Sequence, residues 1–284
     1  MSASEQEPYA YCDALLRRED PDRWLAALFL PAERRPHVHA LYAFNLEIGR
    51  VRRSASEPFL GEIRFQWWRE VLTGDRAGEA AANPVAAALT STLERCELPV
   101  APLLALIDAR LFDLYDAPMP TTEALEAYAG ATAGQLFQLA AAILNPKSGT
   151  EPGEAATHAG AAYAMTGLMR ALPWHAATGQ VYLPKDMLER HGAVFEAVQA
   201  GIGSPALRAA LAELRGRARG HLEKFAACPE AKAAPAAGAF LPVSLCESYL
   251  RCMEKAGYEP FQSMVRLPQW RRQWCLWRAA KAIK

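Results

Sequence analysis

Apolar residues that recur every three or four positions are the feature of this sequence that most restricts its fold. Residues 101–117 and 121–144 show this spacing most clearly. It places the apolar side chains on one face of an α-helix. Alanine-rich stretches, which also favour helix, occur at 80–88, 131–142, 155–164 and 206–212. Strictly alternating runs of Val, Ile and Thr are absent. The sequence therefore predicts an all-α protein.

The helical pattern is interrupted at five places, none long or polar enough to mark a domain boundary. These interruptions lie at 76–84, 116–120, 145–153, 192–205 and 228–238. We interpret the last, which is rich in alanine and proline, as a surface loop. We expect residues 1–284 to form a single domain that ends in a basic, tryptophan-rich helix at about 266–284.

Composition excludes several classes of protein. With 51% hydrophobic and 22% charged residues the chain is not disordered. The 31 basic and 31 acidic residues leave no net charge, which excludes a general nucleic-acid binder. The six cysteines form no C-x-x-C pair and indicate reduced thiols. We find no signal peptide and no apolar run long enough to span a bilayer, so we expect a cytoplasmic protein.

Common catalytic motifs such as G-x-S-x-G, the P-loop and H-E-x-x-H are absent. Two pairs of aspartates have the spacing of a possible Mg²⁺ site. Asp113 and Asp116 lie three residues apart, and we interpret them as the solvated face of a helix near its end. Asp20 and Asp22 flank a proline, which is typical of a helix start.

Four segments in chain order resemble the squalene/phytoene synthase family. Residues 28–54 are similar to its first signature, and residues 61–74 to the segment that follows it. YAGATAGQLFQLAAAIL at 128–144 resembles the Tyr-x(5)-Gly helix of the family. LMRALPWHAATGQVYLP at 168–184 resembles the second signature, which ends in G-x-V-Y-L-P. The resemblance extends over about residues 9–280.

This resemblance implies an isoprenoid-synthase fold, a helical bundle around a central apolar cavity. Active members of the family join two prenyl diphosphates head to head. They ionise an allylic diphosphate with Mg²⁺, which aspartates on two facing helices hold. The signatures of active members run like A-F-C-R-x-A-D-D-I-x-D and N-x-x-R-D-x-x-E-D-x-x-x-G-R-x-Y-L-P.

The acidic positions of both signatures carry no acid in this chain. Their places are taken by Gly49, Arg50, Arg53, Ala171, Trp174 and His175. A guanidinium group repels Mg²⁺ instead of binding it. We therefore expect no catalytic residues, no bound metal and no cofactor. The alternative is an active prenyl transferase with a rearranged site, in which Asp113 and Asp116 hold Mg²⁺.

A chain that lacks these acids but keeps the rest of the signatures resembles a divergent branch of the family. That branch includes the mitochondrial assembly factor for respiratory complex I, and A-F-N-x-E at 43–47 and Q-x-W at 66–68 are similar to it. The resemblance implies a protein that helps to assemble complex I (NADH:quinone oxidoreductase), with its subunits or assembly intermediates as partners. It also implies a place at the inner face of an energy-transducing membrane. A further hypothesis is a binding module for isoprenoids or lipid phosphates.

The side chains at the altered positions allow several interpretations. Arg50 and Arg53 bind a prenyl diphosphate or lipid phosphate without metal, or they form internal salt bridges, for example with Glu47 or Glu57. Arg170 and Tyr182, which keep the family pattern, either contact a diphosphate or join two helices.

Trp174 and His175 are larger than the acids they replace, and we expect them to fill part of the former metal site. For His175 we expect a buried, hydrogen-bonded side chain.

The C-terminal segment carries Trp270, Trp274 and Trp277 at helical spacing, with six Lys or Arg and no acid between 266 and 284. This pattern fits a last helix that packs its tryptophans on the core. It also fits an interfacial helix on an anionic membrane.

Overall fold

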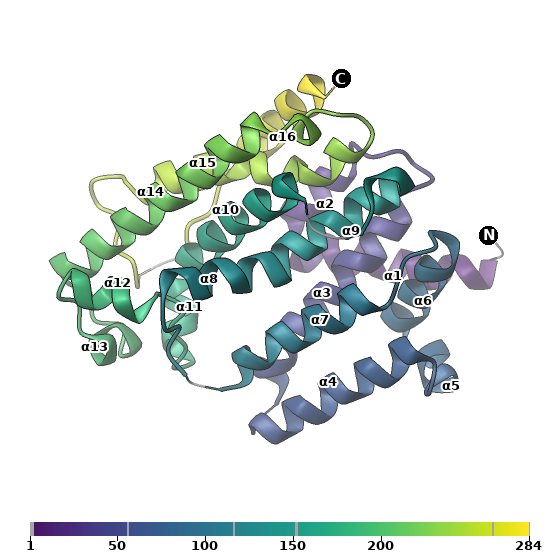
Figure 1. The fold of residues 1–284 in the computed structure, drawn as a ribbon, viewed down its shortest axis with the longest axis horizontal. Coiled ribbons are helices and arrows are strands. Elements are labelled where there is room, and N and C mark those ends of the chain that lie inside the picture. The colour runs from purple at the N-terminus through teal and green to yellow at the C-terminus, as the bar shows by residue number, and fades with distance from the viewer. Residues whose placement is uncertain (1–2, 56, 116, 151–152, 263, 284) are drawn as a thin grey trace.

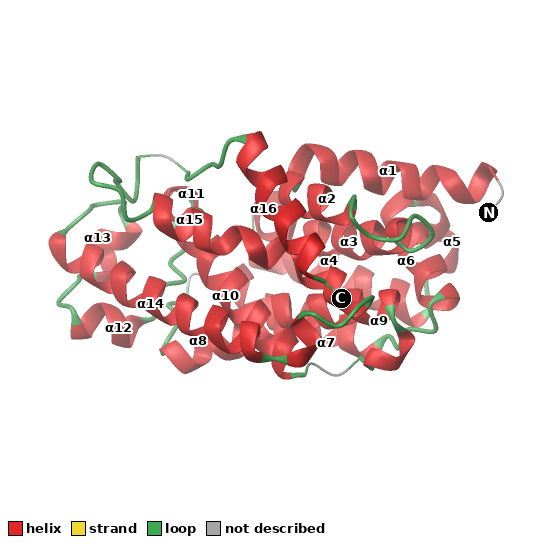
Figure 2. Cartoon of the chain, turned by 90° about the horizontal axis from the view of Figure 1, so that it is seen from above, coloured by secondary structure: helices red, strands yellow, loops and turns green. Residues whose placement is uncertain are grey.

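The computed structural model describes residues 3–55, 57–115, 117–150, 153–262 and 264–283. Every regular element in these ranges is a helix, and the helices pack into an elongated bundle (Figures 1 and 2). The predicted all-α fold is therefore confirmed.

The N-terminal half contains α1 (Ala3–Glu19), α2 (Pro21–Ala27), α3 (Arg35–Ser54), α4 (Pro58–Thr73), α5 (Ala77–Ala82), α6 (Pro84–Arg95), α7 (Ala101–Arg110), the 3₁₀ turn η1 (Leu111–Leu114), α8 (Thr122–Ala129), the π-helical turn η2 (Gly130–Gly134) and α9 (Gln135–Leu144). The C-terminal half contains η3 (Pro146–Ser148), α10 (Glu154–Arg170), α11 (Leu172–Ala177), α12 (Lys185–Arg190), α13 (Phe195–Gln199), α14 (Pro205–Ala227), η4 (Pro229–Ala231), η5 (Ala236–Leu245), α15 (Cys246–Cys252) and α16 (Gln269–Ala282).

The interior around α3 is built from large aromatic side chains. Phe44 on α3 and Trp68 on α4 are fully buried, and their rings meet edge to face at 5.1 Å between centroids. Phe137 on α9 contacts Tyr163 on α10 and Phe240 on η5 at 5.4 Å and 5.9 Å. Burying one such side chain contributes about 1.5–3 kcal/mol, so these contacts fix α3, α4, α9 and α10 relative to one another.

A close crossing of two helices explains the π-helical turn in the Tyr-x(5)-Gly segment. Gly160 of α10 lies against Gly134 of η2 so tightly that a Cβ atom on Gly160 would be 2.3 Å from the Gly134 nitrogen. A π-turn inserts one residue into a helix and is often found at functional sites. Only glycine fits at Gly160 because the two backbones touch there.

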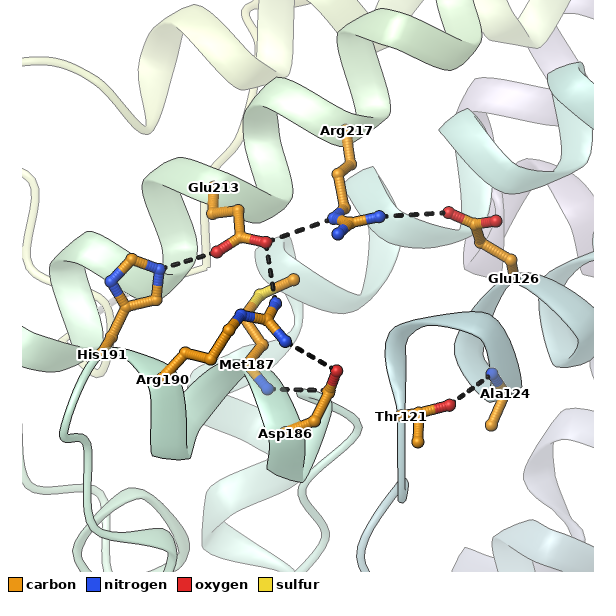
Figure 3. Close-up of polar contacts among 9 residues, drawn as sticks. All are labelled: Thr121, Ala124, Glu126, Asp186, Met187, Arg190, His191, Glu213 and Arg217. Atoms are coloured by element: carbon orange, nitrogen blue, oxygen red, sulfur yellow. Dashed lines mark hydrogen bonds and ion pairs between the residues drawn. The ribbon is translucent and has the colours of Figure 1, made fainter.

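Polar side chains attach α14 to α12 and α8 on the outside of the bundle (Figure 3). Glu213 of α14 accepts a hydrogen bond from Arg190 at 2.9 Å and lies 2.7 Å from His191. It also pairs with Arg217, which reaches Glu126 of α8 at 3.8 Å. Exposed ion pairs contribute little stability each, so this network mainly orients the outer helices.

Several element boundaries follow the expectations and others do not. Thr121 and Asp20 cap α8 and α2 as predicted, since their side chains accept from the backbone N–H of Ala124 and Arg23. The helix expected over 101–117 ends earlier, at Arg110, and continues as the 3₁₀ turn η1.

The middle of the segment at 228–238 is the surface loop that we expected, because residues 229–235 are exposed apart from half-buried Ala231, but its two ends are not. Cys228 and the last three residues, from Ala236 to Gly238, are buried. η5 then continues through the core, because its small and apolar side chains fit between α9 and α16.

The C-terminal tryptophans do not pack on the core. Trp270, Trp274 and Trp277 are 68%, 54% and 40% exposed, whereas Leu276 on the inner face of α16 is fully buried. The core-packing interpretation of these tryptophans is therefore wrong. A helix turns 100° per residue, which places Leu276 and the tryptophan stripe on different faces.

Candidate functional site

The altered positions of the two signatures face each other at the C-terminal ends of α3 and α10 and in α11. Arg53 of α3 lies over the ring of Trp174 of α11, with 5.1 Å between its guanidinium carbon and the ring centroid. A cation over an indole face is attracted by the ring electrons. The two positions where active relatives carry opposing acids thus contact each other directly.

Arg50 and Gly49 complete the altered first signature. Arg50 forms a salt bridge of 2.6 Å with Glu19 at the end of α1. An internal salt bridge was one of the two interpretations, but its partner comes from α1 and is neither Glu47 nor Glu57. Gly49 has open space where a Cβ would be, so it makes no close approach to a neighbouring element.

The donor set at these positions does not fit Mg²⁺. Two guanidinium groups, an indole and an imidazole stand where hard oxygen ligands are needed, and Gly49 and Ala171 offer no side-chain donor. Among the described residues, no group of three or more His, Cys, Asp or Glu side chains is placed to hold a metal ion. These side chains therefore do not fit the metal-dependent ionisation of a diphosphate.

Asp22 organises the polar side of the site. It is 6% exposed and accepts a hydrogen bond from the hydroxyl of Tyr249 at 2.5 Å. Arg272 of α16 donates to its other oxygen at 3.1 Å, and Arg170 lies at 3.5 Å. The guanidinium of Arg170 also stacks on Tyr249, 3.4 Å from the ring centroid. Asp22 thus joins α2, α10, α15 and α16, a role beyond the helix start that we expected for it.

A cleft of about 490 Å³ opens beside Asp22. We call it the Asp22 cleft; its charged lining residues are Arg18, Glu19, Asp20, Asp22, Arg170, Arg266 and Arg272. Most of these charges already have partners, since Glu19 binds Arg18 and Arg50, and Asp20 binds Arg23. The predicted site residues Arg170 and Ala171 line this cleft, whereas Arg53, Trp174 and His175 are not among its lining residues.

Tyr182, the other retained residue, belongs to a second polar cluster around Asp113. One carboxylate oxygen of Asp113 accepts from Tyr182 at 2.9 Å and from Tyr128 at 2.8 Å. The other accepts from Arg110 at 3.0 Å. Burial raises the pKa of both tyrosines well above the usual value, so they remain protonated donors.

Our interpretation of Asp113 as part of a solvated helix face is wrong. Asp113 is 6% exposed and lies in the 3₁₀ turn η1, which points its side chain inward toward α8 and the Tyr182 segment. Asp116, its proposed partner in the alternative metal site, lies outside the described residues.

His175 is half-buried and packs edge to face on Tyr182, with 4.8 Å between the ring centroids. Burial lowers its pKa to about 4, so its neutral form predominates near neutral pH. The hydrogen bond that we expected is missing at Nδ1, which is buried and has no partner among the described residues.

Two important residues escaped the sequence analysis. Tyr249 and Arg272 complete the Asp22 cluster, although they lie 227 and 250 residues away from Asp22 in the chain. Neither stands in one of the signatures. For Arg272 the available signal was the basic character of the C-terminal helix, which we attributed to its solvent or membrane face.

Comparisons with known proteins identify the family of this chain. The squalene/phytoene synthase family profile matches residues 16–278. A Rattus norvegicus protein named NADH dehydrogenase (ubiquinone) complex I, assembly factor 6, is 31% identical over 92% of this chain and 78% of its own length. The Homo sapiens protein of the same name is 30% identical over 90% of this chain and 77% of its own length.

Enzymes of the family are similar as well. A phytoene synthase from Thermus thermophilus is 28% identical over 100% of this chain and 96% of its own length. A dehydrosqualene synthase crystal structure covers 98% of this chain and 96% of its own, with a TM-score of 0.79 and 20% identity, which supports the fold alone. Because the family profile matches nearly the whole chain, this protein belongs to the squalene/phytoene synthase family.

Proposed function

We propose that this protein is a non-catalytic member of its family that assists the assembly of respiratory complex I at the inner face of an energy-transducing membrane. The observation that carries the proposal is the contact between Arg53 and Trp174. By the resemblance of the two signatures, these two residues stand at positions where active members carry acids for Mg²⁺. Relatives that are 30–31% identical carry the name of a complex I assembly factor, which supports the choice of complex I.

The alternative of an active prenyl transferase has less support. Its proposed acid, Asp113, already accepts from two tyrosines and one arginine, so its oxygens are taken up by protein donors. The nearby cation Arg110 also opposes metal binding. A new metal site would have to break this cluster.

Deletion of the gene in the organism that encodes the protein tests the proposal. We expect native gels to show a loss of assembled NADH:quinone oxidoreductase, with succinate:quinone oxidoreductase as the unaffected control. The wild-type gene should restore assembly. Normal NADH:quinone oxidoreductase in the deletion strain would contradict the proposal.

The Asp22 cleft supports a second candidate function, the binding of a phosphate-type anion. Arg266 lines the cleft and has no ion-pair partner among the described residues, while Arg170 and Arg272 share the single carboxylate Asp22. Guanidinium groups bind phosphates through paired N–H donors without metal. Such a ligand would be a prenyl diphosphate or a lipid phosphate.

Isothermal titration calorimetry with farnesyl diphosphate and with inorganic pyrophosphate, each without metal, tests this candidate. We expect saturable binding that Arg266→Ala weakens at least tenfold, because a charge-assisted contact is lost. Arg251→Ala is the control, since Arg251 pairs with Glu247 away from the cleft. No heat of binding for either ligand would exclude the anion-binding function.

A further inference from the structure

The outer face of α16 presents three tryptophans to solvent. Trp270, Trp274 and Trp277 are exposed, and the last two stack on each other at 5.1 Å between ring centroids. Among the described residues, none of their indole N–H groups has a hydrogen-bond partner. Three adjacent exposed tryptophans form an apolar patch with free polar edges, which is unusual for a surface that faces only water.

Basic side chains surround this patch. At 100° per residue, Lys281 shares the tryptophan face, and Arg271 and Arg278 flank it on one side. The ammonium of Lys281 lies 4.1 Å from the ring centroid of Trp277. Among the described residues, none of these three cations has a carboxylate within salt-bridge distance, and no acid occurs after Glu259 in the sequence.

The orientation of the face is fixed by contacts on the other side of α16. Leu276 is fully buried, and Arg272 donates to Asp22 of α2 at 3.1 Å. α16 also packs along η5, and it runs on the outside of the bundle at the top of Figure 1. The tryptophans therefore point away from the protein because the helix cannot turn without breaking these contacts.

We propose that the outer face of α16, formed by Trp270, Trp274, Trp277, Arg271, Arg278 and Lys281, docks this protein onto an anionic lipid bilayer. Tryptophan rings settle at the headgroup level of a bilayer, where the ring is apolar and the N–H finds polar partners. Lysine and arginine beside them are attracted to anionic headgroups. The uncompensated positive charge of this face selects a negatively charged surface.

The geometry corresponds to a helix that lies in the membrane plane. Within the described residues no helix is long and apolar enough to cross a bilayer. The buried inner face of α16 remains attached to the bundle, so docking requires no unfolding.

Sedimentation with vesicles tests the proposal on the full chain. Vesicles of phosphatidylcholine alone are compared with vesicles that contain about 30% phosphatidylglycerol. We expect binding to the anionic vesicles to be about 100-fold stronger, because three cations near an anionic surface each contribute about fivefold. Raising the salt concentration to about 0.5 M should reduce this binding by screening.

Two variants separate the aromatic and the electrostatic contributions. Trp270→Ala/Trp274→Ala/Trp277→Ala should lose binding to both kinds of vesicle. Arg271→Glu/Arg278→Glu/Lys281→Glu should bind anionic vesicles no better than neutral ones. Phe59→Ala/Ile63→Ala is the matched control, because these exposed apolar residues lie on α4 at the opposite edge of the molecule (Figure 1).

Melting temperatures of all variants establish that each is folded. The proposal is overturned if the wild-type chain does not sediment with anionic vesicles. It is also overturned if the tryptophan variant, folded, binds as the wild type does. Because these measurements use lipid alone, they are independent of any role in complex I assembly.

Discussion

Single carboxylates determine the local electrostatics of this protein. Asp22 compensates Arg170 and Arg272, and Asp113 compensates Arg110, each from a nearly buried position. Removing a buried partner leaves its opposite charge desolvated, which costs much more than breaking a surface pair. The acidic residues of the two signatures are absent from this chain. Asp22 and Asp113 instead pair with arginines and so connect the elements that carry them.

Substitution of Asp22 tests this role. We expect Asp22→Asn to lower the free energy of unfolding by about 2–4 kcal/mol, because two arginines lose their shared carboxylate. Urea denaturation followed by circular dichroism measures the change. Asp108→Asn is the control, since its pair with Arg69 is exposed, and a loss of less than about 1 kcal/mol is expected there. Equal losses in both variants would contradict the account.

Buried His39 and half-buried His175 should make the protein less stable in mild acid. Burial lowers the pKa of His39 and of His175 to about 4, below the usual 6.5. Between pH 6.5 and 4 the unfolded chain binds protons at these positions and the folded chain does not. The free energy of unfolding therefore decreases as the pH is lowered through this window. The decrease is at most about 1.4 kcal/mol per pH unit for each histidine.

His175→Asn should reduce the slope of stability against pH. At pH 8, where His175 is neutral in the folded and in the unfolded protein, the change in stability reports only the loss of packing. Thermal melting from pH 8 to pH 4.5 measures both quantities. An unchanged slope in the variant would show that His175 titrates normally in the folded protein.

At the scale of helices, the close crossing at Gly160 and Gly134 should be sensitive to a single methyl group. Gly160→Ala places a Cβ 2.3 Å from a backbone nitrogen, and α10 must shift. We expect the free energy of unfolding to decrease by about 1–3 kcal/mol. Gly220→Ala on α14 is the control, because nothing lies within 4 Å of its Cβ position and alanine favours helix. Similar stabilities of the two variants would refute the close crossing.

The helices were more predictable than the way they end or bend. The spacing of apolar residues identified the segment from 121 to 144, and Thr121 capped it as expected. The spacing of apolar residues did not reveal the π-turn at 130–134, nor that Gly160 of another helix packs closely against it. The alanine and proline content correctly indicated the exposed loop at 229–235, but it gave no sign that the buried helix η5 already begins at Ala236.

At the scale of the whole molecule, the family resemblance proposed the candidate site, and the contacts of its residues became visible only in the structure. The altered signatures predicted the loss of the acids, but not that Arg53 would stack on Trp174. The Asp22 cluster joins residues separated by 148 to 250 positions, which no local pattern reveals. The face of α16 likewise became clear only when the structure showed which side of the helix is buried.

Incubation of the purified protein with farnesyl diphosphate and Mg²⁺ is the most direct test of the claim that this site is non-catalytic. The phytoene synthase relative from Thermus thermophilus, with geranylgeranyl diphosphate, serves as the positive control. This protein is incubated with farnesyl diphosphate and, separately, with geranylgeranyl diphosphate, and the released pyrophosphate is measured. We expect no release above a control without protein, because Arg53 and Trp174, which contact each other, replace acids of the two signatures and cannot bind Mg²⁺. Sustained Mg²⁺-dependent release of pyrophosphate would contradict it.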